Sequence, residues 1–328
     1  MEKCEGLREL GFCEKVNMRV PPVFCSTCQG DSAKWRKENT VEFREKNRKP
    51  LTKQQKNDTD KVSVIIPATE DERPYIERTI KSIKDNASGP IEIILICDGW
   101  GESYAVDKII CNGNRLGQRA SVNMAAELAS GKYLMRLDAH CAMSPGWDAR
   151  MKSSCGDTDL VALVFDHLDP ETWEGEGRDA AFWRLDAKLK CHSVRPWKRL
   201  ADREIEEETM AISGGAWMIK KDYYWSLGGH DESLGGHGAV GPEWSLKVWL
   251  TGGRVLIRTD VICYHLFRAQ TPFTIDVKAK ERAFKKLYQQ WVVGTDERRK
   301  KPMEWLLYKF NWCNKKAGTR VRDASIFL

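Results

Sequence analysis

The chain has 328 residues, of which 41% are hydrophobic and 30% charged, and its formal net charge is +6. This composition is typical of an ordinary globular protein and excludes an intrinsically disordered chain. No apolar run approaches the roughly 18 residues of a membrane-spanning helix, and the N-terminal MEKCEGLREL lacks the apolar core of a secretory signal. We therefore expect a cytoplasmic protein whose 11 cysteines stay reduced, because disulfides rarely persist in that compartment.

The first 60 residues are expected to form a cysteine-containing head followed by a polar, Lys-rich linker. The segment CSTC is a Cys-x-x-Cys pair, which lets two thiolates reach one tetrahedral metal ion. Two further cysteines upstream would complete a structural Zn²⁺ site, although their irregular spacing favours cysteines that bind no metal. The four candidate ligands are Cys4, Cys13, Cys25 and Cys28.

A pattern of strand, helix and strand begins at residue 61. The β-branched run VSVIIP (62–67) predicts a strand, and YIERTIKSIKDN (75–86) has apolar residues at helical spacing. IEIILIC (91–97) predicts a second buried strand. This order is typical of a parallel α/β sheet with helices on its faces. We therefore predict an α/β domain that begins at residue 61.

The next two elements lead to an acid at the end of a strand. RASVNMAAELASG (119–131) predicts a helix with Gly131 as its C-terminal stop, and KYLMRL (132–137) predicts the strand that ends at Asp138. In open α/β sheets, ligands bind beyond the carboxyl ends of the strands. We therefore expect Asp98, which ends the preceding strand, to lie at the same edge of the sheet as Asp138.

Asp138 is followed two residues later by His140. An isolated Asp-x-His is more often a turn acid and a surface histidine than a pair of ligands. The alternative is that Asp138 and His140 form half of a metal site, because a carboxylate oxygen and an imidazole nitrogen are both common metal ligands. The rest of the chain must then supply the other half.

Several segments, in the same order, resemble the GT-A glycosyltransferases, and most closely the catalytic domain of the polypeptide N-acetylgalactosaminyltransferases. They are VSVIIP, ILICDG, GQRASVNMAAELASGKYLMRLDAHC, SGGAWMIKKDYYWSLGGHDESL, GPEWSLKVWLTGGRVLI and YHLFR. The resemblance covers about residues 61–275. It implies a GT-A, Rossmann-like mixed sheet flanked by helices.

The resemblance implies a metal-dependent glycosyltransferase that uses a nucleotide sugar, with a uridine diphosphate sugar favoured. A divalent ion would neutralise the leaving diphosphate as a Lewis acid. The implied ligands are Asp138, His140 and His265, and one carboxylate with two imidazoles suits Mn²⁺ better than Mg²⁺. Without the resemblance, His265 would be taken for a packed core histidine.

The resemblance also implies residues that contact the donor and the acceptor. Glu243 is expected to be a catalytic residue on the acceptor side, with Asp138 on the metal side, although an acid at a helix N-terminus also stabilises the helix without any further function. Arg119 is expected either to supply a cation to the pyrophosphate or to be a solvated charge at the start of a helix. The residues expected to contact the donor are Thr69, Glu70, Asp98, Arg119 and Gly215.

The basic charge is concentrated near the C-terminus, since residues 271–328 hold 14 Lys or Arg against 6 Asp or Glu. We expect a basic helical tail over residues 276–328. Such a tail can bind a polyanion or simply form a solvated helix face. Together with the cysteine-containing head it weakly favours DNA with hydroxymethylpyrimidines as the acceptor, a modification of some phages that would place the enzyme in the host cytoplasm. A protein Ser or Thr or a glycan is the alternative acceptor.

Two other classes of function stay open. One carboxylate and two histidines also form the metal triad of non-haem iron oxygenases, although those sites usually lie in all-β barrels. The chain could also be a non-catalytic protein that binds zinc and nucleic acid. The sugar, the acceptor, the stereochemical outcome and the oligomeric state do not follow from the sequence.

Overall fold

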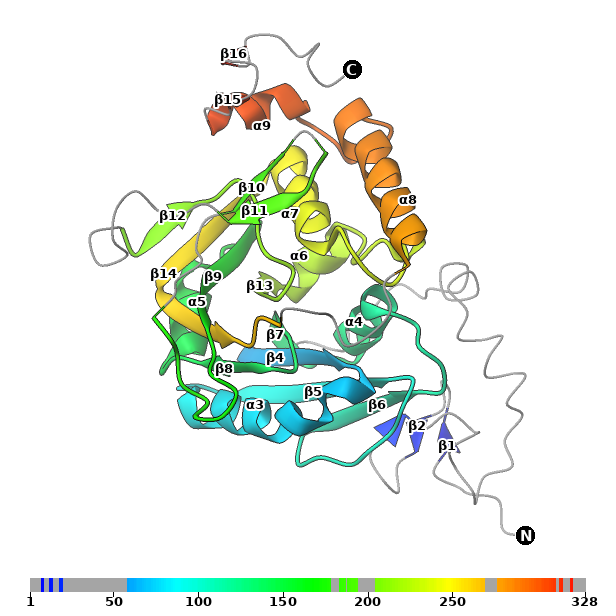
Figure 1. Ribbon diagram of the computed structural model, residues 1–328, viewed down its shortest axis with the longest axis vertical. Coiled ribbons are helices and arrows are strands. Elements are labelled where there is room, and N and C mark those ends of the chain that lie inside the picture. The colour runs from blue at the N-terminus through cyan, green and yellow to red at the C-terminus, as the bar shows by residue number, and fades with distance from the viewer. Residues whose placement is uncertain are drawn as a thin grey trace.

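The computed structural model describes residues 58–177, 183–186, 188–193, 204–268 and 276–310, together with five two-residue strands nearer the termini (Figure 1). Cys4, Cys25 and Cys28 lie outside the described residues, and Cys13 is described only by its backbone. The predicted zinc site and polar linker therefore stay predictions.

The centre of the fold is one mixed sheet of 12 strands. The order across the sheet is β1 (Leu7–Arg8), β2 (Phe12–Cys13), β3 (Met18–Arg19), β6 (Lys108–Asn112), β5 (Ile91–Asp98), β4 (Asp58–Ala68), β7 (Gly131–Leu137), β13 (Ala216–Lys220), β9 (Asp159–His167), β14 (Arg254–His265) and β12 (Glu206–Glu208), with β8 (Cys141–Met143) paired to β14. The strands β6, β5, β4 and β7 run parallel to one another, and β13 then pairs antiparallel with both β7 and β9. Two small hairpins lie apart from it, β10 (Trp183–Leu185) with β11 (Cys191–Ser193) and β15 (Cys313–Asn314) with β16 (Thr319–Arg320).

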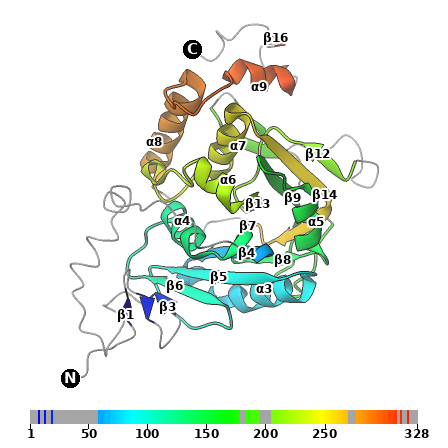
Figure 2. The same ribbon diagram turned by 180° about the vertical axis from the view of Figure 1, so that it is seen from behind.

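Helices cover both faces of this sheet (Figures 1 and 2). The described helices are α3 (Arg73–Asn86), α4 (Gln118–Leu128), α5 (Trp147–Ser154), α6 (Lys221–Ser226), α7 (Val240–Thr251), α8 (Val277–Leu287) and α9 (Met303–Lys309), with short 3₁₀ turns at Glu70–Glu72 and Glu232–Leu234 and a π-helical turn at Tyr288–Val293. On one face the buried side chains of α3 and α5 pack in one hydrophobic core, and on the other those of α4, α6 and α7 pack in a second core.

The alternation of side chains along β4 explains why there are two cores. Val62, Val64 and Ile66 belong to the core beneath α3, whereas Ile65 belongs to the core beneath α4. Successive side chains of a strand point to opposite faces, so a strand with apolar side chains on both faces must be covered on both sides. The predicted mixed α/β sheet flanked by helices is therefore present.

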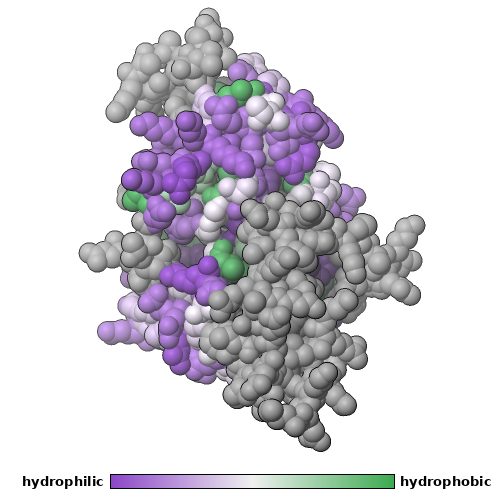
Figure 3. Space-filling view, turned by 90° about the vertical axis from the view of Figure 1, so that its right-hand side faces the viewer, coloured by the Kyte–Doolittle hydropathy of each residue, from purple (hydrophilic) through white to green (hydrophobic). Residues whose placement is uncertain are grey.

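The basic C-terminal segment is folded onto the rest of the molecule. Leu287 of α8, Trp291 of the π-helical turn and Leu306 of α9 belong to the same hydrophobic core as Trp249 of α7. The described side chains on the face seen in Figure 3 are mostly hydrophilic, with only small apolar patches. The predicted boundary at residue 275 stays a prediction, but these helices share a core with the sheet.

Gly131 does not have the predicted role of a helix stop. Helix α4 ends at Leu128, and Gly131 is the first residue of β7. A Cβ atom at this position would lie 2.6 Å from the carbonyl oxygen of Lys61. The glycine is thus required by the close approach of β7 to β4, which sequence spacing alone does not reveal.

Two further expectations concern disulfides and membrane spans. Among the cysteines whose side chains the structure describes, all six are free. In the same described part of the chain, no helix has both the length and the apolar character needed to cross a bilayer.

Candidate metal centre and donor site

Three side chains meet at the carboxyl ends of β7 and β14. Asp138 directly follows β7, and His265 is the last residue of β14. The antiparallel pairing of β8 with β14 places Cys141 opposite His265, and this brings His140 beside the end of β14. One ligand atom from each of Asp138, His140 and His265 lies within 4.8 Å of the others. The structure thus brings together the three predicted ligands.

The chemistry of the three side chains fits a divalent ion. The imidazole Nε2 of His265 lies 3.2 Å from Oδ2 of Asp138, and the rings of His140 and His265 are 4.6 Å apart. The other ring nitrogen of His265, Nδ1, is buried and has no hydrogen-bond partner among the described residues. A carboxylate with two imidazoles is a donor set that Mn²⁺, Fe²⁺ and Zn²⁺ accept more readily than Mg²⁺ does.

The surroundings keep the site in the protonation state that binds a cation. Burial opposes the ionisation of Asp138, but the charge of Arg136, whose Nη2 lies 2.6 Å from Oδ1, and the hydrogen bond of His265 hold the pKa of Asp138 far below its usual range. Burial lowers the pKa of His265, despite the opposing effect of Asp138. A charged carboxylate and a neutral imidazole are the forms that bind metal.

Glu72 fixes the orientation of His140. Its Oε1 lies 2.6 Å from Nδ1 of His140, and its Oε2 accepts a hydrogen bond of 2.9 Å from the backbone N–H of Thr69. Arg268 adds a longer contact of 3.4 Å to the same Oε1. A carboxylate bound to one ring nitrogen directs the other nitrogen, here Nε2, outward as a ligand.

Gly215 shapes the space beside Asp138. Its carbonyl oxygen accepts hydrogen bonds from the backbone N–H of Asp138 at 2.9 Å and from Nη1 of Arg136 at 2.6 Å. A Cβ at Gly215 would lie 2.9 Å from Oδ2 of Asp138, which is closer than real Cβ atoms approach. The structure therefore places this predicted donor residue beside the three candidate metal ligands.

The other predicted donor residues lie at the same sheet edge with different surroundings. Thr69 follows β4, and its hydroxyl oxygen is buried without a partner among the described residues. Glu70 is largely exposed and lies 3.6 Å from Arg73. The carboxylate of Asp98, the last residue of β5, accepts hydrogen bonds from the backbone N–H groups of Leu116 and Gly117, both at 2.8 Å. Asp98 thus holds the loop that precedes α4.

Arg119 and Glu243 bind each other rather than the open site. Both side chains are fully buried, and Nε of Arg119 donates to Oε2 of Glu243 at 2.7 Å. The other two nitrogens of Arg119 donate to the carbonyl oxygens of Gly235 and Gly238. Lys247 donates to Oε1 of Glu243 at 2.8 Å. Two buried charges must stay paired, so Arg119 and Glu243 hold each other in this structure. Their expected contacts with a pyrophosphate and with an acceptor stay predictions.

Sequence reasoning missed Glu72, Arg136 and Arg268. Arg136 could have been found, because it lies two positions before Asp138 and residues i and i+2 share one face of a strand. Glu72 resembles an ordinary acid at a helix start. Glu72 and His140 are 68 residues apart in the sequence, so no short sequence pattern predicts their contact.

Comparison with known proteins identifies the family of this domain. The profile described as "Glycosyl transferase family 2" matches residues 63–228, which is half of the chain. The chain belongs to glycosyl transferase family 2. This family 2 protein is 28% identical over 239 residues to the putative polypeptide N-acetylgalactosaminyltransferase 13 of Drosophila melanogaster, over 65% of this chain and 42% of the relative. It is 24% identical over 256 residues to the human polypeptide N-acetylgalactosaminyltransferase 10, over 70% of this chain and 42% of that relative.

Solved structures confirm the predicted GT-A fold. A structure of GalNAc-T7 with UDP, GalNAc and Mn²⁺ superposes with a TM-score of 0.60 at 22% identity, over 74% of this chain and 49% of that one. A structure of S. aureus TarS 1-349 in complex with UDP-GlcNAc gives a TM-score of 0.52 at 13% identity, over 76% of this chain and 70% of that one. The family 2 protein spans about two fifths of the length of the curated relatives it matches.

Proposed function

We propose that this family 2 protein transfers a sugar from a UDP-sugar to a hydroxyl group, with Asp138, His140 and His265 holding Mn²⁺. The convergence of their ligand atoms within 4.8 Å at the edge of a GT-A sheet carries this proposal. It is supported by the presence of UDP and Mn²⁺ in the GalNAc-T7 structure and of UDP-GlcNAc in the TarS structure.

The residues of the chain have separate tasks in this proposal. When bound, the cation would stabilise the negative charge that develops on the leaving diphosphate. Asp138 offers a charged oxygen because Arg136 keeps it ionised. Glu72 holds His140 by Nδ1 and so leaves Nε2 for the metal. Gly215 leaves space beside Asp138 that any other residue would narrow.

For the acceptor, we propose a hydroxyl of a polypeptide. The matched relatives are named as polypeptide N-acetylgalactosaminyltransferases, and this favours Ser or Thr over the DNA acceptor expected from the charge of the tail. The contacts of the tail agree with this choice. Arg298 pairs with Asp296 at 2.6 Å, and Arg299 donates to the carbonyl oxygens of Val292 and Lys301. Two cations of the ERRKK run are thus used inside the protein and are less available to phosphate groups.

The alternative of an iron oxygenase rests on the same three ligands. The mixed α/β sheet with helices on both faces and the family 2 match do not favour it, because such triads usually lie in all-β barrels. A non-catalytic zinc and nucleic-acid-binding protein would not need a carboxylate kept ionised beside two histidines. The proposed sugar transfer uses the carboxylate and both histidines.

Donor and acceptor can be tested in one assay. The full chain is incubated with UDP-GalNAc or UDP-GlcNAc, with Mn²⁺ or with a chelator, and with a Ser/Thr-rich peptide or hydroxymethylcytosine DNA. We expect Mn²⁺-dependent release of UDP and mass addition on the peptide. Incorporation into DNA alone would replace the proposed acceptor, and no UDP release from either donor would contradict the proposed donor class.

A further inference from the structure

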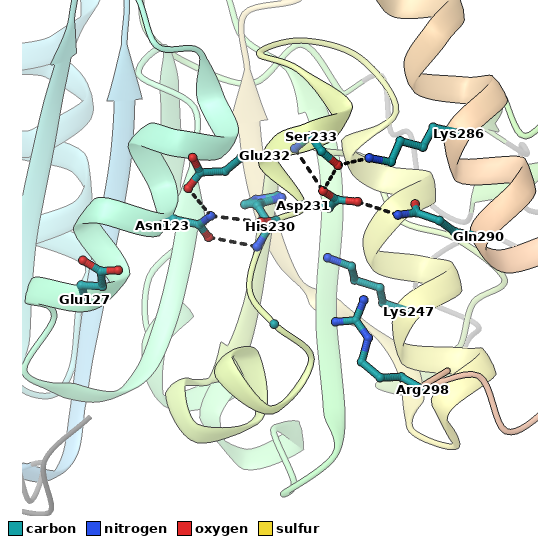
Figure 4. A pocket seen from close by; sticks show the side chains of 11 residues that line it. Asn123, Glu127, His230, Asp231, Glu232, Ser233, Lys247, Lys286, Gln290 and Arg298 are labelled. Atoms are coloured by element: carbon teal, nitrogen blue, oxygen red, sulfur yellow. Dashed lines mark hydrogen bonds between the residues drawn. The ribbon is translucent and has the colours of Figure 1, made fainter. Parts of the chain in front are cut away.

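A cavity of about 380 Å³ lies between α4, α7 and α8 (Figure 4). Its walls come from α4, from segment 228–233, from Lys247 of α7, and from α8 and the segment that follows it. None of the three predicted metal ligands lines it. Its volume is in the range of about 300–1,000 Å³ that is usual for sites of small molecules. The lining is almost entirely polar, which sets it apart from a packing defect.

Two oxygen atoms in the lining side chains need hydrogen-bond donors. Oε2 of Glu232 and Oε1 of Gln290 are buried and have no partner within the described parts of the chain. The opposite atom of each group is already held, because Oε1 of Glu232 accepts from Asn123 at 2.8 Å and Nε2 of Gln290 donates to Asp231 at 2.7 Å. Buried acceptors without a partner are costly. An occupant of this cavity should therefore carry N–H or O–H groups.

The charges of the cavity are distributed unevenly over two walls. Figure 4 shows Glu127 and Glu232 on the side of α4, whereas Lys247, Lys286 and Arg298 lie on the side of α7 and α8. The third carboxylate of the lining, Asp231, is already held by Ser233 and Gln290, and Arg298 already pairs with Asp296. Lys247 is almost completely buried, with a side-chain exposure of 2%. A ligand that carries a positive group at one end and a negative group at the other would match both walls, because charge-assisted hydrogen bonds are the strongest that such side chains form.

We propose that this cavity binds a small zwitterion, with its ammonium group at Glu232 and its anionic group at Lys286 and Lys247. A neutral polyol would satisfy the unpartnered oxygens but would offer no charge to Glu232 or Lys286. A simple anion or a simple cation would match only one wall. No step of the proposed sugar transfer is involved, and the two proposals can fail separately.

Binding of the zwitterion should also raise the free energy of unfolding. Lys247 donates to Gly229 at 2.6 Å and to Glu243 at 2.8 Å, and Glu243 in turn binds Arg119. The cavity wall therefore belongs to the buried network that joins α4 to α7. A ligand that binds only the folded state raises the free energy of unfolding in proportion to the logarithm of its concentration over Kd.

The test uses calorimetry and thermal unfolding on the full chain. The probes are glycine, β-alanine and 4-aminobutanoate, three zwitterions with increasing charge separation, and the comparison compounds are propylamine, propanoate and galactose. We expect at least one zwitterion to bind at one site per chain, at least about tenfold more tightly than any comparison compound. Equal affinities, preferred binding of galactose, or no zwitterion binding at about 10 mM would each overturn the proposal.

Variants locate the binding site. Glu232→Gln and Lys286→Gln should each weaken binding of the preferred zwitterion about tenfold, because each removes one charged partner. Glu281→Gln and Lys285→Gln are the matched controls, since both residues are exposed on α8 and neither lines the cavity. Asp138→Asn should keep zwitterion binding even if sugar transfer is lost. Unchanged binding by the Glu232 and Lys286 variants would place the zwitterion elsewhere and contradict the inference.

Discussion

Oε1 of Glu72, at the turn that precedes α3, lies 2.6 Å from Nδ1 of His140, which follows β7. This contact connects the end of β4 to the candidate metal ligands, and Oε2 of the same carboxylate is anchored by the backbone of Thr69. Carboxylates that orient a histidine ligand typically change metal affinity by about 10–100-fold when removed. Glu72 is thus a positioning residue for the proposed Mn²⁺ site.

The first prediction concerns that contact. Glu72→Gln should weaken Mn²⁺ binding about 10–100-fold, because an amide holds the imidazole less strongly than a carboxylate. Calorimetric titration of Mn²⁺ into the full chain measures the effect without any need for turnover. Glu70→Gln is the control, since Glu70 is two residues away and largely exposed. Equal weakening in both variants would mean that the effect is general electrostatics rather than orientation of His140.

The second prediction concerns Gly215. Gly215→Ala places a methyl group 2.9 Å from Oδ2 of Asp138, so either the carboxylate or the strand must shift. We expect Mn²⁺ affinity to fall several-fold while the thermal midpoint changes by only a few degrees. Gly177→Ala gives a control for an alanine in an open position, because no atom lies within 4 Å of a Cβ there, although its φ of +71° adds strain of its own. Full Mn²⁺ affinity in Gly215→Ala would show that this glycine has no role at the site.

The third prediction concerns the buried pair of Arg119 and Glu243. Both side chains have no exposed surface, so Arg119→Met should lower the free energy of unfolding by about 3–5 kcal/mol, because it leaves a buried carboxylate with one cation fewer. Urea unfolding followed by circular dichroism measures this change. If Arg119→Met instead kept full stability and lost only UDP binding, this result would support the predicted contact of Arg119 with the pyrophosphate.

The fourth prediction concerns pH. Burial lowers the pKa of His230 from 6.5 to about 4, although Glu243 opposes this shift. The folded state therefore resists protonation, so the stabilisation is complete above pH 6.5 and is lost as the pH falls toward 4. The loss attributable to His230 is about 3 kcal/mol. His237 and His265, whose pKa values are also lowered by burial, act in the same direction.

A variant separates the contribution of His230. His230→Gln should flatten the decline in unfolding free energy between pH 6.5 and 4.5, because it removes the imidazole whose pKa is lowered by burial. An unaltered slope in His230→Gln would show that this histidine is not the main titrating group.

Local sequence patterns predict most of the elements of the fold that position the site. The apolar runs of β4, β5 and β7 predict buried strands because side-chain alternation and β-branched content are local properties. The roles of Gly131 and Arg119 could not be predicted in this way. The first depends on the approach of a neighbouring strand, and the second on a partner 124 residues away in the sequence.

The candidate site likewise combines residues that a local pattern predicts with one that it does not. Asp138 and His140 stand two residues apart and attract notice by themselves, but His265 was assigned only through the resemblance to glycosyltransferases. Its position beside them is set by the pairing of β8 with β14, which no short sequence pattern encodes.

Metal binding by His265→Ala tests the central claim most directly, because His265 is far from Asp138 and His140 in the sequence. The account predicts that wild-type protein binds one Mn²⁺ per chain and releases UDP from a UDP-sugar only when Mn²⁺ is present. It predicts that His265→Ala keeps its fold by circular dichroism but loses both properties, whereas His192→Ala keeps both. Normal Mn²⁺ affinity and normal UDP release in His265→Ala would contradict the three-ligand site and, with it, the proposed function.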